Sequence, residues 1–231
     1  VIERGLHVEI DKEDVDKHYS FDWHGIRFEM HYQIETFGSR RHQLRFNRMI
    51  DEAMAEQADS FTVCDSDGNE TEVSVLPPEE DLIVVFKHWF NHLLVEGVGL
   101  RQTLDLAVLL NAYRDKINVG RLMTALDGIG YMKAFRAMLA MMKRYFGLEW
   151  LDSNYVLGCR DEWYANKLMA AVMESGNFGR KAYKNHTEGK KKSMETATRA
   201  LRHCVMFLRL APKDIICLIS RRIGITLKQK I

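Results

Sequence analysis

Residues 91–110, NHLLVEGVGLRQTLDLAVLL, join two apolar helices through a glycine-rich turn. Apolar residues recur at helical spacing before the turn and again after it, so we expect the two helices to pack at the centre of the fold. Gly97 and Gly99 can adopt the positive φ angles that end a helix and reverse the chain. The side chains expected in the core are those of Trp89, Leu93, Leu104 and Leu109.

Arg101 and Asp105 form an i,i+4 pair at the start of the second helix. Two interpretations stay open. The pair is either a surface ion pair, which contributes a few tenths of a kcal/mol, or a polar pair that faces a ligand.

Composition limits the class of protein. The chain has 231 residues, 46% of them hydrophobic, which is enough for one large domain or two smaller ones. It has no apolar run of about 20 residues and no signal peptide, so we expect no membrane partner. Its four cysteines lack metal or disulfide spacing, which favours the cytoplasm. The start at Val1 indicates that an N-terminal portion is missing.

Charge divides the chain into two parts. Residues 1–81 contain 20 Asp and Glu against 8 Lys and Arg, whereas residues 82–231 contain 12 against 25. The change falls near Leu76-Pro77-Pro78. We therefore predict an α/β unit at residues 1–76 and a helical domain at residues 77–231.

Residues 1–76 are predicted to form two hairpins with a helix between them. Residues 18–23 and 26–34 flank His24-Gly25, and the second run alternates, with Arg27, Glu29 and His31 on its polar face. This face meets either solvent or a site. A helix is expected at residues 41–57, and a second hairpin joins residues 61–64 to 72–75. Asp65 and Asp67 lie in its turn and are explained by turn geometry rather than by metal binding.

The second part is predicted to be a helical bundle. A helix is expected to start at Pro77-Pro78, where three acidic residues follow. Further helical runs cover about 100–116, 119–127, 130–146, 161–175, 193–210 and 212–223. His88 and His92 are four residues apart and could share a metal, but the glutamate of an H-E-x-x-H motif is absent, so zinc is not favoured. The basic run at 180–202 is either a phosphate-binding stretch or a solvated loop.

Three segments together resemble a known family. VLPPEEDLIVVFKHWFNHLLVEGVGLRQTLDLAVLL at 75–110, GNFG at 176–179 and LRLAPKDIICLISRR at 208–222 are similar to bacterial, Bacteroides-type nucleotidyltransferase family proteins, which are often uncharacterised. GIRFEMHYQI at 25–34 resembles the strand of that family in which a glutamate precedes a histidine. The resemblance covers most of the chain, and EGVGLRQTLD is its most specific part.

The resemblance implies a fold like that of DNA polymerase beta-like nucleotidyltransferases. The fold class is therefore α+β, with a partial mixed sheet followed by a mainly α-helical bundle. The family's first two carboxylates form D-x-D after a Gly-Gly or Gly-Ser turn, and this pattern does not occur here. We expect that pair upstream of Val1, so the chain by itself is expected to transfer nothing. The third carboxylate matches Glu29.

The implied reaction transfers a nucleotidyl group from an NTP to an unknown acceptor by two-metal catalysis. Clustered carboxylates would hold Mg²⁺, which neutralises phosphate charge. Glu29 is the expected metal ligand and catalytic residue, and His31 is expected to support it. The residues expected to bind nucleotide or acceptor are Arg27, His92, Arg101, Asp105, Asn177 and Arg180.

Two rival functions stay open. A helical interaction module without chemistry is favoured if the D-x-D pattern is also absent upstream. A nucleic-acid-binding protein is possible but not favoured; it requires the basic run to share a groove with Arg101, and binding that weakens steeply with salt. The acceptor and the preferred NTP are not specified by these residues.

Overall fold

The computed structural model describes residues 18–23, 25–31, 33–56, 60–151, 155, 157–175 and 190–228. The chain divides into two compact units, Val1–Thr36 and Phe37–Ile231. Each is described by itself. Within the described residues, no helix is both long and apolar enough to cross a bilayer.

The first unit contains the predicted hairpin. Strands β1 (His18–Trp23) and β2 (Ile26–His31) pair antiparallel around Gly25, which has a φ of 75°. The Phe21 and Phe28 rings stack across the two strands with centroids 5.4 Å apart. Such cross-strand aromatic pairs stabilise a ribbon and fix its register.

The second unit begins with α1 (Arg40–Ala55), whose N-cap residue is Ser39. Strands β3 (Ser60–Cys64) and β4 (Glu70–Ser74) form the second predicted hairpin, and every residue of both strands is exposed. Helix α1 packs against helices α2 and α4 of this unit. The division between the two compact units falls at Thr36. The predicted domain boundary near Leu76 stays a prediction.

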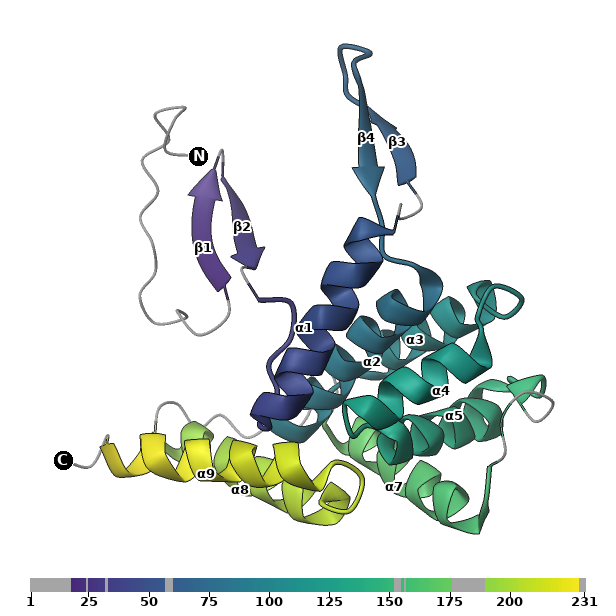
Figure 1. Cartoon of the computed structure of the whole chain (residues 1–231). Helices are drawn as coiled ribbons and strands as arrows, with labels where there is room; N and C mark the ends of the chain where they lie inside the picture. The colour runs from purple at the N-terminus through teal and green to yellow at the C-terminus, as the bar shows by residue number, and fades with distance from the viewer. Residues whose placement is uncertain are drawn as a thin grey trace. The chain divides into compact units, whose positions relative to one another are not determined.

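The remaining helices form the bundle that is seen in Figure 1. They are α2 (Pro78–Val95), α3 (Leu100–Ala112), α4 (Val119–Gly128), α5 (Met132–Phe146), α7 (Cys159–Ser175), α8 (Lys190–Phe207) and α9 (Pro212–Lys228). Helix α2 contacts α1, α3, α4 and α8, and α3 also contacts α5 and α7. The expectation that these two helices lie at the centre is confirmed.

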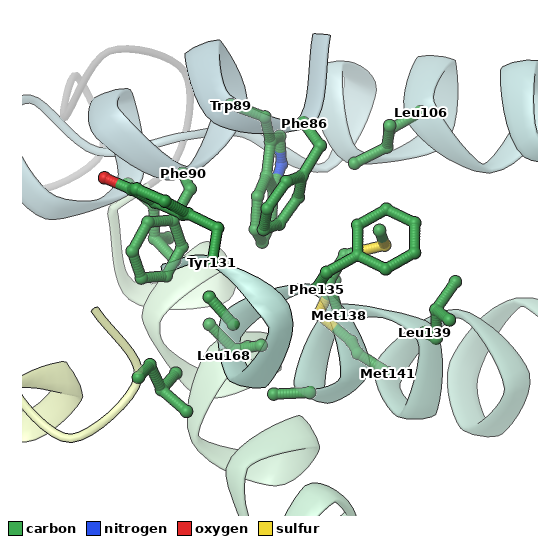
Figure 2. Close-up of a cluster of buried hydrophobic side chains, with 14 of the residues drawn as sticks. Phe86, Trp89, Phe90, Leu106, Tyr131, Phe135, Met138, Leu139, Met141 and Leu168 are labelled. Atoms are coloured by element: carbon green, nitrogen blue, oxygen red, sulfur yellow. The ribbon is translucent and has the colours of Figure 1, made fainter. Parts of the chain in front are cut away.

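The core is aromatic where α2 faces α5. Phe86, Phe90 and Phe135 are fully buried, and Figure 2 shows them with Tyr131 and the α5 methionines. The Phe86 and Phe135 rings meet edge to face at 5.1 Å, an arrangement that aromatic pairs favour. Met138 and Met141 are also fully buried, as expected for methionines that fill gaps in a core.

The predicted core face of α3 is wrong in part. Trp89 and Leu93 of α2 are buried as expected, but Leu104 is 49% exposed and Leu109 is only half-buried. The buried residues of α3 are Thr103, Leu106, Ala107 and Leu110. Thr103 takes the core position because its hydroxyl accepts a hydrogen bond from Trp89 Nε1 at 3.2 Å and donates to the Gly99 carbonyl at 3.0 Å. These two hydrogen bonds satisfy the polar atoms of a face that also buries Leu106, Ala107 and Leu110.

The predicted α+β class is confirmed, because most described residues are helical and the strands form antiparallel ribbons. The strands within the described residues form two separate two-stranded ribbons, both antiparallel.

Candidate functional site

Strand β2 carries the residue expected to be catalytic. Glu29 pairs in register with Ser20 of β1, and its neighbours Arg27 and His31 lie two residues away on either side. Residues two apart belong to the same face of a strand, so the predicted polar face of β2 is consistent with the observed register.

The register also adds a residue that the sequence reasoning missed. Asp22 pairs with Arg27, directly beside the Ser20 and Glu29 pair. Residues opposite one another in an antiparallel ribbon share a face, and diagonal neighbours lie about 7–8 Å apart. A second carboxylate residue therefore shares the face of Glu29. The signal was present in residues 18–23, where His18, Ser20 and Asp22 alternate with aromatic residues.

The glycine turn between α2 and α3 is formed by two different conformations. Gly97 has a φ of 93°, which ends α2 as predicted. Gly99 has a φ of −89° and is the N-cap of α3, where its N–H donates to Gln102 Oε1 at 3.1 Å. The expectation of a positive φ at Gly99 is therefore wrong.

Arg101 and Asp105 are both exposed on the first turns of α3. Among the ion pairs of the described residues, none joins these two side chains. The surface ion-pair interpretation is thus not supported. Their predicted role in binding a ligand stays a prediction.

His92 lies in the last turn of α2 and is linked to two neighbours on the same helix. Its Nδ1 is 3.0 Å from Glu96 Oε2, and its Nε2 is 2.9 Å from Nε2 of His88. The His92 ring is partly exposed, with 28% of its side-chain surface accessible. The sequence identified the histidine pair but not the carboxylate that extends it.

Helix α8 supplies the caps of this helix end. The Arg199 guanidinium donates to the Glu96 carbonyl at 2.7 Å, and His203 Nδ1 lies 2.8 Å from the Leu93 carbonyl. Both side chains are buried. The last carbonyls of a helix have no partner within the helix, and cations there also meet the negative end of its dipole.

This arrangement weakens the nucleic-acid interpretation of the basic run. Arg199 is engaged with the protein backbone, and Arg202 pairs with Glu174 of α7. The Glu174 carboxyl has a pKa below its usual value because Arg202 donates a hydrogen bond to it. Two of the cations proposed to meet phosphate therefore stabilise the bundle instead.

The Asp65 turn has a structural explanation. Asp65 Oδ1 accepts hydrogen bonds from the backbone N–H groups of Asp67 and Asn69, at 2.9 and 2.8 Å, and Gly68 has a φ of 83°. The Asn69 side chain and backbone lower the pKa of Asp65. The predicted turn is confirmed.

A charged cleft of about 420 Å³ lies between α1, α2 and α4. Glu80 is almost fully buried at its edge, and its Oε1 accepts a hydrogen bond from Arg121 at 2.8 Å. Glu56 reaches the same guanidinium at 3.9 Å. These carboxylates raise the pKa of Arg121, which keeps it charged. None of Glu56, Glu80 and Arg121 belonged to the site predicted from the sequence. The helix boundaries alone do not show which helix faces meet.

Lys87 is a further residue that the sequence reasoning missed. It is buried, and its Nζ lies 4.7 Å from the centroid of the Phe37 ring and 5.0 Å from the centroid of the Tyr131 ring. The same Nζ donates a hydrogen bond to Asn91 Oδ1 at 2.8 Å. Aromatic faces and an amide oxygen compensate a buried ammonium group.

The other predicted binding residues, Asn177 and Arg180, lie outside the described residues. The same holds for the side chains of Asp22, Arg27, Glu29 and His31. The two units are not placed relative to one another, so the proximity of Glu29 to Arg101, Asp105 or His92 stays a prediction.

The folded chain is thus an α+β protein with a polar-faced hairpin and a helical body. A model of the uncharacterised nucleotidyltransferase family matches residues 3–147, which spans both hairpins and helices α1 to α5. The chain belongs to this family. Comparison with the curated proteins and with the solved structures gave no match.

Proposed function

We propose that this protein transfers a nucleotidyl group from an NTP to an acceptor, and that Glu29 supplies one carboxylate of the reaction site. The observation that carries the proposal is the family match over residues 3–147, which includes the β2 strand of Glu29 and the α2–α3 turn. The register of β2 is consistent with it, because Arg27, Glu29 and His31 share a face.

Each residue of this face has a role in the proposal. Glu29 orients the acceptor hydroxyl and takes its proton, a task for which a carboxylate within hydrogen-bond reach is suited. His31 supports Glu29 by a hydrogen bond. Arg27, which pairs in register with Asp22, offsets the negative charge of the phosphates.

The residues of the helical body complete the proposed binding site. Arg101 carries a cation for the triphosphate on an exposed turn. Asp105 and His92 offer polar groups to the acceptor, as do Asn177 and Arg180 from the GNFG segment. These assignments follow from charge and from the family resemblance.

Mg²⁺ is expected from the family. It would neutralise phosphate charge and favour an ionised hydroxyl. A divalent ion needs several oxygen ligands, and Glu29 alone does not provide them. Within the described residues, no group of three or more His, Cys, Asp or Glu side chains is arranged to hold a metal. We therefore assign no step of the reaction to Mg²⁺ on the described residues, and propose that further ligands lie outside them.

The test compares Glu29→Gln with the parent in the complete gene product that contains this chain. Pyrophosphate release is measured with each NTP and a set of hydroxyl-bearing acceptors. Removing a general base should lower turnover about 10²- to 10⁴-fold, while circular dichroism shows an unchanged fold.

The matched control is Glu70→Gln, the same substitution on the exposed strand β4. It should leave turnover unchanged. An unimpaired Glu29→Gln variant, or equal losses in both variants, would remove Glu29 from the mechanism.

A further inference from the structure

The end of helix α2 carries a line of three polar side chains at intervals of one turn. His88, His92 and Glu96 occupy positions i, i+4 and i+8, which lie on one face of a helix. The two imidazole rings lie with centroids 4.4 Å apart and their Nε2 atoms 2.9 Å apart. On its other side, His92 Nδ1 meets Glu96 Oε2 at 3.0 Å.

We propose that His88 and His92 bind one transition-metal dication through their two Nε2 atoms, and that Glu96 orients His92 for this purpose. The ligand class is a borderline dication such as Ni²⁺ or Zn²⁺, which prefers imidazole, and not Mg²⁺, which prefers oxygen. The test of this site does not require nucleotidyl transfer, although a metal on His92 would occupy a group that the proposed function offers to the acceptor.

The distances agree with ligation. Two nitrogens bound to one tetrahedral zinc ion at about 2.0–2.1 Å are themselves about 3.3 Å apart. The two Nε2 atoms are 2.9 Å apart, so small rotations of the exposed His88 ring and the partly exposed His92 ring would admit the ion. Because both rings project from one rigid helix, this adjustment needs no movement of the backbone.

The carboxylate is the observation that separates this pair from two neighbouring surface histidines. Histidines that bind metals usually donate their second ring N–H to a carboxylate, which fixes the tautomer and makes the other nitrogen a better ligand. Glu96 takes this position at His92 Nδ1. In an H-E-x-x-H motif the glutamate is the general base of peptide hydrolysis, whereas the two histidines bind the metal. The absence of that glutamate therefore does not prevent His88 and His92 from binding a metal.

The tautomers are consistent with metal binding without net proton loss. When His92 Nδ1–H donates to Glu96, His92 Nε2 carries a lone pair and accepts a hydrogen bond from His88 Nε2–H. To bind the metal, a neutral His88 moves its proton from Nε2 to Nδ1 by exchange with water. Both Nε2 lone pairs then face the ion.

The local charges act in opposite directions. The Glu96 carboxylate and the C-terminal end of the α2 dipole favour a cation. The Arg199 guanidinium, bonded to the Glu96 carbonyl, opposes it. Two protein ligands leave the other positions to water, because the described residues contain no cluster of three ligands. We therefore expect binding in the micromolar range rather than the tight binding of a structural zinc site.

The test titrates Ni²⁺, and separately Zn²⁺, into the complete chain by isothermal calorimetry at pH 7.5. His88→Ala and His92→Ala should each weaken the site at least tenfold. Glu96→Gln should weaken it about 10- to 100-fold, the usual effect of removing such a carboxylate. Ni²⁺ should also raise the melting temperature of the parent but not that of His88→Ala.

The control for Glu96→Gln is Glu149→Gln, which removes a carboxylate from another exposed position and should leave the affinity unchanged. Unaltered Ni²⁺ affinity in either alanine variant would overturn the site. Equal affinities of Glu96→Gln and Glu149→Gln would overturn the role of Glu96. Competition by equimolar Mg²⁺ would overturn the ligand class.

Discussion

Replacing Leu106 by Ala should destabilise the protein far more than replacing Leu104 by Ala, although the two residues are two positions apart on α3. Leu106 is fully buried, whereas Leu104 is 49% exposed. Removing three buried carbon atoms costs about 2.4 kcal/mol in transfer free energy at about 0.8 kcal/mol for each methylene. The cavity left behind brings the expected loss at Leu106 to about 2–5 kcal/mol.

The same substitution at Leu104 removes contacts that are only half shielded from water. The transfer term is then about 1.2 kcal/mol at most, and alanine's higher helix propensity offsets part of it. We expect a loss below about 1 kcal/mol.

The measurement is urea unfolding followed by the helical circular dichroism signal, with the free energy of unfolding extrapolated to zero denaturant. The slopes of parent and variants must agree, so that the difference reports stability rather than a change in the unfolded state. A loss above about 2 kcal/mol at Leu104, or below about 0.5 kcal/mol at Leu106, would show that the face of α3 assigned to the core is wrong.

Two further predictions concern contacts that α8 and α9 make with distant parts of the second unit. Burial lowers the pKa of His203 below 6.5, so the unfolded state binds more protons below that pH and the protein becomes less stable as the pH falls from 7.5 to 5. His203→Asn should make the free energy of unfolding, measured by urea unfolding at each pH, depend less on pH. An unchanged pH dependence would contradict the assignment. Gly38→Ala should destabilise the protein by about 1–3 kcal/mol in the same assay, because its new methyl group would overlap Cβ of Cys217. The control is Gly120→Ala, whose methyl group has space and should cost no stability.

Local sequence patterns predicted the elements of this protein well. The alternation at residues 26–31 and the turn at Gly25 predicted the β1–β2 hairpin, and the polar turn around Gly68 predicted β3–β4. The apolar periodicity and the glycine and proline breaks predicted all of the described helices. These features depend on backbone geometry over a few residues, so the sequence contains the information directly. The polar face with Glu29 was predicted from alternation alone, and its role as a site stays a prediction.

The face that each helix buries depended on partners far away in the sequence. Thr103 is buried, and its hydroxyl accepts a hydrogen bond from Trp89 in another helix. Hydrophobicity alone favoured Leu104 for that place, since apolar residues also follow the exposed line of Leu100, Leu104 and Val108. Its hydrogen bonds reduce the cost of burying the threonine hydroxyl, so a polar residue can lie on the core face while Leu104 stays exposed.

The sequence by itself determined the fold class, the order of the elements and the family resemblance that points to nucleotidyl transfer. Only the tertiary structure decided that Arg199 and His203 cap α2 rather than meet a ligand, and that Glu96 extends the histidine pair. The sequence does not show whether a charged residue faces water, a carbonyl group or a metal. Its role is set by the groups that folding brings within hydrogen-bond distance, and those lie more than one hundred residues away for both Arg199 and His203.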